Sequence, residues 1–241
     1  MAEKVAIVTG AGSGIGAATV WRLADLGMTA IGVGRNLAKL ESMKSGYSGG
    51  GRIELRAADV SDRAAVAALV KGVLHDFGRI DVLVNNAGVN AKERSLARVT
   101  IDEFERQVKI NLIGAFQVIH AVLPAMRERK DGLIINISSI AAPRPSALAG
   151  AAYAASKAGV SAMSSVVAQE EGKNGIRSTS ICPGEVDTPL LEDRPEPISA
   201  ERRASILLPD DVAAAVAFIT TLPPRAHVPE MIIKPTAHLY I

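Results

Sequence analysis

The stretch "VAIVTGAGSGIGAATVWRLADLG", residues 5–27, joins a strand-like run to a helix-like run through a glycine-rich loop. Residues 5–9 are mostly apolar and β-branched, and residues 17–27 have the composition of a helix. Gly10, Gly14 and Gly16 lie between them and permit a tight turn, a close approach of the main chain to a ligand and close packing of the helix. The order of strand, loop and helix indicates the first unit of a parallel α/β sheet.

The start of this helix is a candidate phosphate site. Main-chain N–H groups there attract phosphates, and glycines in a loop that follows a strand and opens a helix are typical of dinucleotide binding. The sequence therefore predicts a dinucleotide cofactor bound by five residues of the loop, namely Gly10, Ser13, Gly14, Ile15 and Gly16.

The end of the second predicted strand, residues 29–34, bears on which dinucleotide binds. NAD sites usually have Asp or Glu there for the adenosine ribose hydroxyls. Here the chain reads "VGRN", residues 33–36, so Gly34 offers no carboxylate. The guanidinium of Arg35 can instead pair with a 2′-phosphate. This pattern favours NADP(H) over NAD(H); the alternative is that Arg35 only faces solvent at the strand end.

Strand-like and helix-like segments alternate along the whole chain. Helix ends are indicated by Ser61 as the cap of 62–77, by Gly78 after it, and by Thr100 with Glu103 as a capping box for a long helix over 101–129. The alternation predicts a doubly wound parallel sheet, the Rossmann fold, with about seven strands, helices on both faces and a single domain over 1–241. The predicted strands are 5–9, 29–34, 52–58, 80–85, 133–138, 176–182 and 230–234.

The segment "EDRPEPISAERRASILLPDD", residues 192–211, is rich in proline and charge and has no clear strand character. In a doubly wound fold such a segment is often a substrate lid. We expect a lid at about 190–208, and a disordered loop is the alternative.

Composition narrows the class of protein. With 27 basic and 25 acidic residues the net charge is +2, which provides no basic stripe for nucleic acid. The single cysteine, Cys182, excludes an internal disulfide, follows an apolar run and is expected to be buried. Four histidines, at 75, 120, 227 and 238, lack metal-ligand spacing, so no metal site is expected. The N-terminus resembles no targeting peptide and no apolar stretch approaches a membrane span, which predicts a cytoplasmic protein with no membrane partner.

A second motif lies in "GAAYAASKAGVSAM", residues 150–163. Tyr153 and Lys157 are four residues apart, so on a helix both side chains share one face and can act on one bound molecule. The alternative is an ordinary surface pair. A free phenol with a pKa near 10 is a poor base at neutral pH, and a nearby ammonium group favours the phenolate.

Several motifs in this order resemble the short-chain dehydrogenase/reductase family, in its single-domain branch. The resemblance extends from Lys4 to about Thr236. The motifs are "TGAGSGIG" at 9–16, "ADV" at 58–60, "NNAG" at 85–88, Asn111 in "KINLIG", Ser139 in "INISSIA", "YAASK" at 153–157 and "CPGEVDT" at 182–188.

The resemblance implies roles for these residues. Tyr153 would give or take the substrate hydroxyl proton, and Lys157 would also bind the nicotinamide ribose. Ser139 would hold the substrate oxygen, with Ser138 as the competing candidate, because side chains alternate along a strand. Asn111 would order a water that links Lys157 to solvent. The remaining cofactor contacts implied are Asp59 and Val60 beside the adenine, Asn86, Ala87 and Gly88 along the cleft, and Pro183, Gly184, Val186 and Thr188 at the nicotinamide end.

The function predicted is an NADP-dependent oxidoreductase that interconverts a secondary alcohol and a ketone or aldehyde. The alternative is an NADP-sensing regulatory or scaffold protein without turnover; an enoyl reductase fits worse, because such relatives usually space tyrosine and lysine more widely. The resemblance also implies a homotetramer formed through the helix 101–129 and the Tyr153 helix. The sequence does not name the small-molecule substrate. A substrate carboxylate has four candidate partners, Arg144, Arg194, Arg202 and Arg203, and the alternative is that these arginines form a solvated face.

Overall fold

The computed structural model describes residues 3–237, which form one sheet of seven parallel strands in the order β3-β2-β1-β4-β5-β6-β7. The predicted fold class is confirmed. The strands are β1 (Val5–Thr9), β2 (Thr29–Gly34), β3 (Ile53–Ala57), β4 (Val82–Asn85), β5 (Gly132–Ile137), β6 (Ile176–Pro183) and β7 (Glu230–Ile233).

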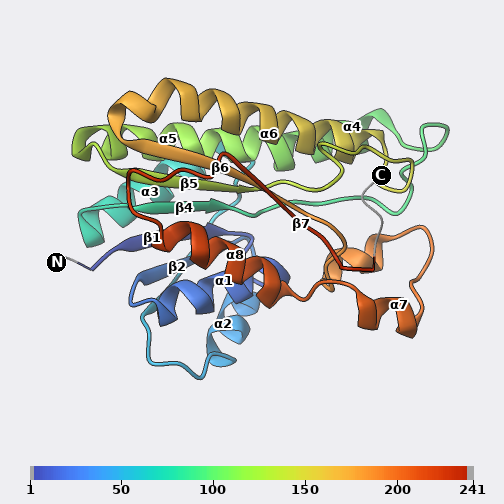
Figure 1. Ribbon diagram of the computed structural model, residues 1–241, viewed down its shortest axis with the longest axis horizontal. Coiled ribbons are helices and arrows are strands. Elements are labelled where there is room, and N and C mark those ends of the chain that lie inside the picture. Colours follow the sequence, from blue (N-terminus) through green and yellow to red (C-terminus); the bar gives the residue numbers. More distant parts are fainter. Residues whose placement is uncertain (1–2, 238–241) are drawn as a thin grey trace.

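Helices cover both faces of this sheet (Figure 1). One layer consists of α1 (Gly14–Asp25), α2 (Leu37–Ser45) and α8 (Pro209–Thr221). The other consists of α3 (Arg63–Phe77), α4 (Ile101–Val108), α5 (Gly114–Arg129) and α6 (Ala151–Glu171). Each layer has its own apolar core against the sheet, because the central strands bury side chains on both faces.

The predicted start of the helix over 62–77 is wrong by one residue. Asp62, not Ser61, is the N-cap of α3, since its carboxylate accepts from the amides of Ala64 and Ala65. Ser61 instead donates both its amide and its hydroxyl to Asp59. Gly78 ends the helix with φ +70°, as predicted.

The long helix predicted over 101–129 is continuous but not uniform. A π-helical turn, Lys109–Ile113, separates α4 from α5. Thr100 caps α4 by accepting from the Glu103 amide, whereas the Glu103 carboxylate binds Arg106 and Gln107. Among the described residues this run, Ile101–Arg129, is long and apolar enough to cross a membrane by length and composition, so the expectation that no segment reaches that length is wrong. In the structure Val118, Ile119 and Val122 of α5 are buried in the core.

The carboxyl ends of the strands meet at one end of the molecule. In chain order the strands build outward from β1 to β3, and β4 then returns to the other side of β1, so a crevice opens between the ends of β1 and β4. The segment 192–211 lies at this end and is partly helical: it contains the last two residues of η3 (Pro189–Asp193), all of α7 (Ala200–Ser205) and the first three residues of α8 (Figure 1). A parallel bridge between Val186 and Leu207 attaches it to the chain that follows β6.

Candidate active site

The glycine loop between β1 and α1 has the shape that a phosphate group requires. Gly10 and Gly14 have φ of +66° and +53°, and a Cβ atom on Gly16 would lie 2.3 Å from the carbonyl oxygen of Gly10. Ser13 precedes α1 and makes no capping side-chain hydrogen bond, so it does not compete for the amides of the first turn. These residues fit the diphosphate of a dinucleotide, because a bound anion can accept from those amides.

Arg35 and Asp59 lie near each other, beyond the carboxyl ends of β2 and β3. Arg35 is exposed. Burial raises the pKa of Asp59, but hydrogen bonds from Ser61 and the charges of Arg35 and Lys109 outweigh it, so the Asp59 pKa lies below its usual value. A Cβ atom on Gly34 would make ordinary contact with Leu40, at 3.4 Å. The strand end therefore has room for a side chain but carries none.

Asn86 and Thr9 join the end of β4 to the glycine loop. The amides of Asn86 and Ala87 donate to the hydroxyl oxygen of Thr9 at 3.0 and 3.1 Å. The Asn86 side chain donates to the carbonyl oxygens of Thr9 and Gly10 at 3.0 and 3.2 Å. These bonds hold the two sides of the crevice in a fixed relation.

Asn111 lies in the π-helical turn and is almost fully buried. Its side-chain oxygen accepts from the amide of Val89 at 2.8 Å, and its nitrogen donates to the Val89 carbonyl and to the Ser156 hydroxyl, each at 3.0 Å. It therefore connects the segment after β4 to α6. Its predicted role in ordering a water stays a prediction.

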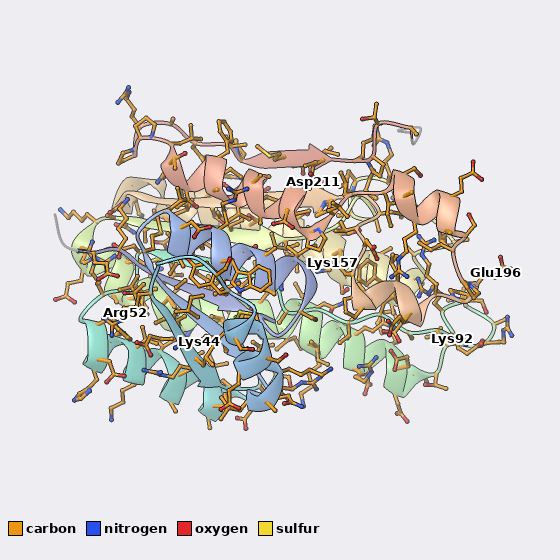
Figure 2. All side chains as sticks on the ribbon, turned by 90° about the horizontal axis from the view of Figure 1, so that it is seen from below. Lys44, Arg52, Lys92, Lys157, Glu196 and Asp211 are labelled. Carbon is orange, nitrogen blue, oxygen red and sulfur yellow. The ribbon has the colours of Figure 1, made fainter. Side chains whose placement is uncertain are left out.

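Lys157 is 4% exposed, and in Figure 2 it lies near the middle of the molecule, whereas the labelled Lys92 lies near the edge. Its Nζ atom donates to the carbonyl oxygen of Ile137 at 2.8 Å. The same atom lies 5.7 Å from the centre of the Tyr153 ring. Burial lowers the pKa of Lys157 to about 8.

Tyr153 is partly buried in the first turn of α6. Burial raises the pKa of its phenol, while a hydrogen bond with Ser139 and the charge of Arg94 act in the opposite direction. Ser138 has other partners, because its hydroxyl donates to the Lys157 carbonyl at 2.9 Å and accepts from Ser161 at 2.9 Å. The structure therefore places Ser139, rather than Ser138, against the Tyr153 hydroxyl.

A cavity of about 440 Å³ joins the glycine loop to Tyr153. It brings together most of the predicted site residues, namely Gly10, Ser13, Gly14, Ile15, Asn86, Gly88, Ser139, Tyr153, Lys157, Pro183, Gly184, Val186 and Thr188. Thr188 also packs on the loop, since a Cβ atom on Gly14 would lie 3.0 Å from its methyl group. Six predicted residues do not line this cavity: Gly16, Arg35, Asp59, Val60, Ala87 and Asn111.

The arginines predicted for a substrate carboxylate include three that form ion pairs within the protein. Arg194 and Arg202 both pair with Glu185, and Arg203 pairs with Asp187, so these three attach the segment 192–211 to the chain after β6. Arg144 and Arg194 line the cavity. Sequence reasoning missed three charged residues that also line it, Glu185, Asp193 and Arg94. Arg94 stands in a charged run that is typical of a solvated loop, so no sequence pattern marks it as buried.

Comparisons with known proteins agree with this geometry. A family model described as short chain dehydrogenase matches residues 4–198. A 3-oxoacyl-acyl-carrier-protein reductase of Thermotoga maritima is 34% identical over 224 residues, 90% of each protein. Among solved structures, a metagenomic short-chain oxidoreductase in complex with NADP is 35% identical, with a TM-score of 0.84 over 98% of this chain and 99% of that one. The closed form of a serine dehydrogenase complexed with NADP⁺ is 30% identical, with a TM-score of 0.90 over 98% of this chain and 96% of that one.

Proposed function

This chain belongs to the short-chain dehydrogenase family, and from that premise we propose that it interconverts a secondary alcohol and a ketone or aldehyde with NADP(H) as cofactor. The observation that carries the proposal is the cavity that Tyr153, Lys157 and Ser139 share with the glycine loop. An acid/base group, a cation, a hydroxyl and a phosphate site in one cavity are the parts that hydride exchange with a carbonyl requires.

In this mechanism Ser139 donates a hydrogen bond to the substrate oxygen and holds the reacting carbon in place. Tyr153 donates its proton to that oxygen during reduction and takes it back during oxidation. The ammonium of Lys157 stabilises the phenolate, because an opposite charge nearby favours the ionised form. When bound, the nicotinamide would supply or accept the hydride.

The preference for NADP(H) rests on Gly34 and Arg35. A carboxylate at the end of β2 would repel a 2′-phosphate, and Gly34 has none. The Arg35 guanidinium is exposed and can form a charge-assisted pair with that phosphate. Two of the similar structures are NADP complexes, which favours the same choice.

Three further assignments belong to the proposal. The segment 190–208 acts as a lid over the substrate end of the cavity, which Leu190, Leu191 and Arg194 line. The protein works in the cytoplasm on a small molecule. It assembles as a homotetramer through α5 and α6, whose outer faces expose Phe116 and Val166 at 52% and 51%. A monomer in light scattering at micromolar concentration would remove the tetramer.

The test is oxidation of NADPH, with NADH in parallel, against ketones, 3-oxo acids, keto sugars and quinones. Turnover with one class is expected, and Tyr153→Phe should lower it by about 10²–10⁴-fold while NADPH affinity stays nearly unchanged. Turnover that survives in Tyr153→Phe would contradict the assignment of the acid/base group. Tight NADPH binding with no turnover across the panel would favour the sensing alternative.

A further inference from the structure

Arg94 is a buried arginine in the irregular segment that follows β4. Arg94 is only 8% exposed, although its neighbours Lys92, Glu93 and Ser95 are all exposed. It lines the same cavity as Tyr153. Burying a guanidinium is costly unless its donors are satisfied, so this position demands a physical reason.

The Arg94 guanidinium donates to the main chain of three separate segments. Its Nε atom donates to the carbonyl oxygen of Ala91 at 2.7 Å, and one terminal nitrogen donates to that of Leu148 at 3.1 Å. The other terminal nitrogen donates to the carbonyl oxygen of Asp193 in η3. A lysine could not make all three bonds, because only a guanidinium offers donors in a rigid planar fork.

The stem of Arg94 packs against Gly150, the residue that directly precedes α6. A Cβ atom on Gly150 would lie 2.7 Å from the Cβ atom of Arg94, and Gly150 has φ +81°. α6 starts at Ala151, so Tyr153 follows within its first turn. Arg94 therefore fixes the chain from which Tyr153 projects.

The charge of Arg94 also reaches Tyr153. All three hydrogen-bond acceptors of Arg94 are carbonyl oxygens, so its hydrogen bonds leave the charge unneutralised. Burial lowers its pKa, and the charges of Asp193 and Tyr153 raise it. An arginine stays protonated throughout the range in which a phenol ionises.

The other charged groups around Tyr153 either form ion pairs of their own or are exposed to solvent. Glu185 pairs with Arg194 and Arg202, and Arg106 of α4 pairs with Glu103. Arg144 is exposed and Asp193 is exposed. Lys157 is the remaining cation, and because its pKa is about 8 its positive charge disappears at higher pH. Burial raises the pKa of the Tyr153 phenol, and the charge of Arg94 acts against that rise.

We propose that Arg94 is a positioning residue that acts through Tyr153: its permanent charge stabilises the tyrosinate, and its hydrogen bonds to Leu148 and Asp193 join the chain before α6 to η3 beside the cavity. This rests on the proposed role of Tyr153 as the acid/base group. The two positive charges therefore act over different pH ranges. The Lys157 ammonium is charged at neutral pH, and the Arg94 guanidinium also keeps its charge at higher pH.

The experiment is a pH titration of tyrosine ring ¹³C chemical shifts in the NADP⁺-saturated protein, with the Tyr153→Phe variant assigning the Tyr153 signal. Arg94→Gln should raise the Tyr153 midpoint by about one pH unit, since removing a positive charge disfavours the phenolate. Arg94→Lys should also raise the midpoint, because a buried ammonium loses its charge at high pH, as that of Lys157 does, and cannot make all three hydrogen bonds. Lys92→Gln is the matched control, because it deletes an exposed charge two residues away.

A Tyr153 midpoint in Arg94→Gln equal to that in Lys92→Gln would overturn the proposal. So would an Arg94→Lys midpoint equal to that of wild type, which would mean that a permanent charge at this position is not needed. If Arg94→Gln does not fold, the comparison of Arg94→Lys with wild type decides, and a raised midpoint is the expected result. The titration needs no substrate, so a failure to find turnover would leave this test intact.

Discussion

The ammonium of Lys157 lies 5.7 Å from the centre of the Tyr153 ring and donates at 2.8 Å to the carbonyl oxygen of Ile137, the last residue of β5. The hydrogen bond ties α6 to the end of the central sheet and holds the cation beside the phenol. The same burial that positions Lys157 disfavours its charge, and this has a consequence for stability.

Lys157 should make the cofactor-free protein more stable as the pH rises from about 8 toward the ordinary lysine range. Its pKa is lowered to about 8 in the folded protein, so over this range the unfolded chain binds more protons and each rise in pH favours folding. The free energy of unfolding should increase by about 2 kcal/mol between about pH 7 and about pH 9.5, and the increase should be absent in Lys157→Met.

Urea unfolding of both proteins without cofactor measures this difference. Lys157→Met should be at least as stable as wild type at neutral pH, while its turnover is lost. Parallel pH dependence in the two proteins would show that Lys157 keeps an ordinary pKa.

Alanine substitutions at Ser138 and Ser139 should affect different properties, the first stability and the second turnover. Ser138 is buried between β5 and α6 and bonds with the Lys157 carbonyl and Ser161, so Ser138→Ala should destabilise the protein by about 1 kcal/mol. Ser139→Ala should leave stability nearly unchanged and lower kcat by about 10²-fold, as loss of an oxyanion donor does. Thermal unfolding and steady-state kinetics on both variants measure this, and the reverse pattern would exchange the two assignments.

The cofactor preference should be reversible at two positions. Arg35→Ala should raise the KM for NADPH by about 10–100-fold and change that for NADH little, because a hydrogen-bonded charge pair contributes about 1.5–3 kcal/mol. Gly34→Asp should then favour NADH, since a carboxylate there can bind the adenosine ribose hydroxyls and its Cβ atom would make only ordinary contact with Leu40. The ratio of kcat/KM for the two cofactors is the measurement. An unchanged ratio in both variants would show that the end of β2 does not determine the cofactor preference.

The strands of the sheet could be predicted because each is marked by a short local pattern in the sequence. Parallel strands buried on both faces read as apolar runs, and all five residues of β1 are buried. The predicted strand ends differ from the observed ones by at most two residues. The predicted strand 80–85 begins at Val82 in the structure, because Asp81 uses its carboxylate to accept from the amide of Val5 and to pair with Arg79.

The features that the sequence could not reveal depend on distant contacts. Arg94 is buried because Leu148 and Asp193, 54 and 99 residues away along the chain, offer it carbonyl oxygens. In the sequence, Arg202 and Arg203 resemble a solvated run of charge, and only the fold places Glu185 and Asp187 beside them. The predicted cap of α3 was wrong for a different reason. Ser61 and Asp62 are both good N-cap residues, and the hydrogen bond of the Ser61 hydroxyl to Asp59 leaves Asp62 as the cap.

The ion pairs of α7 should control substrate binding although neither of their arginines, Arg202 or Arg203, lines the cavity. Arg202 pairs with Glu185 and Arg203 with Asp187, and both arginine side chains are about half exposed, at 49% and 51%. Exposed pairs contribute up to about 1 kcal/mol each, so the double variant Arg202→Gln/Arg203→Gln should raise the substrate KM by about tenfold, with a smaller change in kcat. High salt should raise the KM of wild type toward that of the variant, because ions screen exposed pairs. Glu54→Gln, which removes a comparable pair with Arg52 on β3, is the control and should change neither constant. If the double variant matches this control in KM and in salt dependence, the segment 190–208 does not close over the substrate through these pairs.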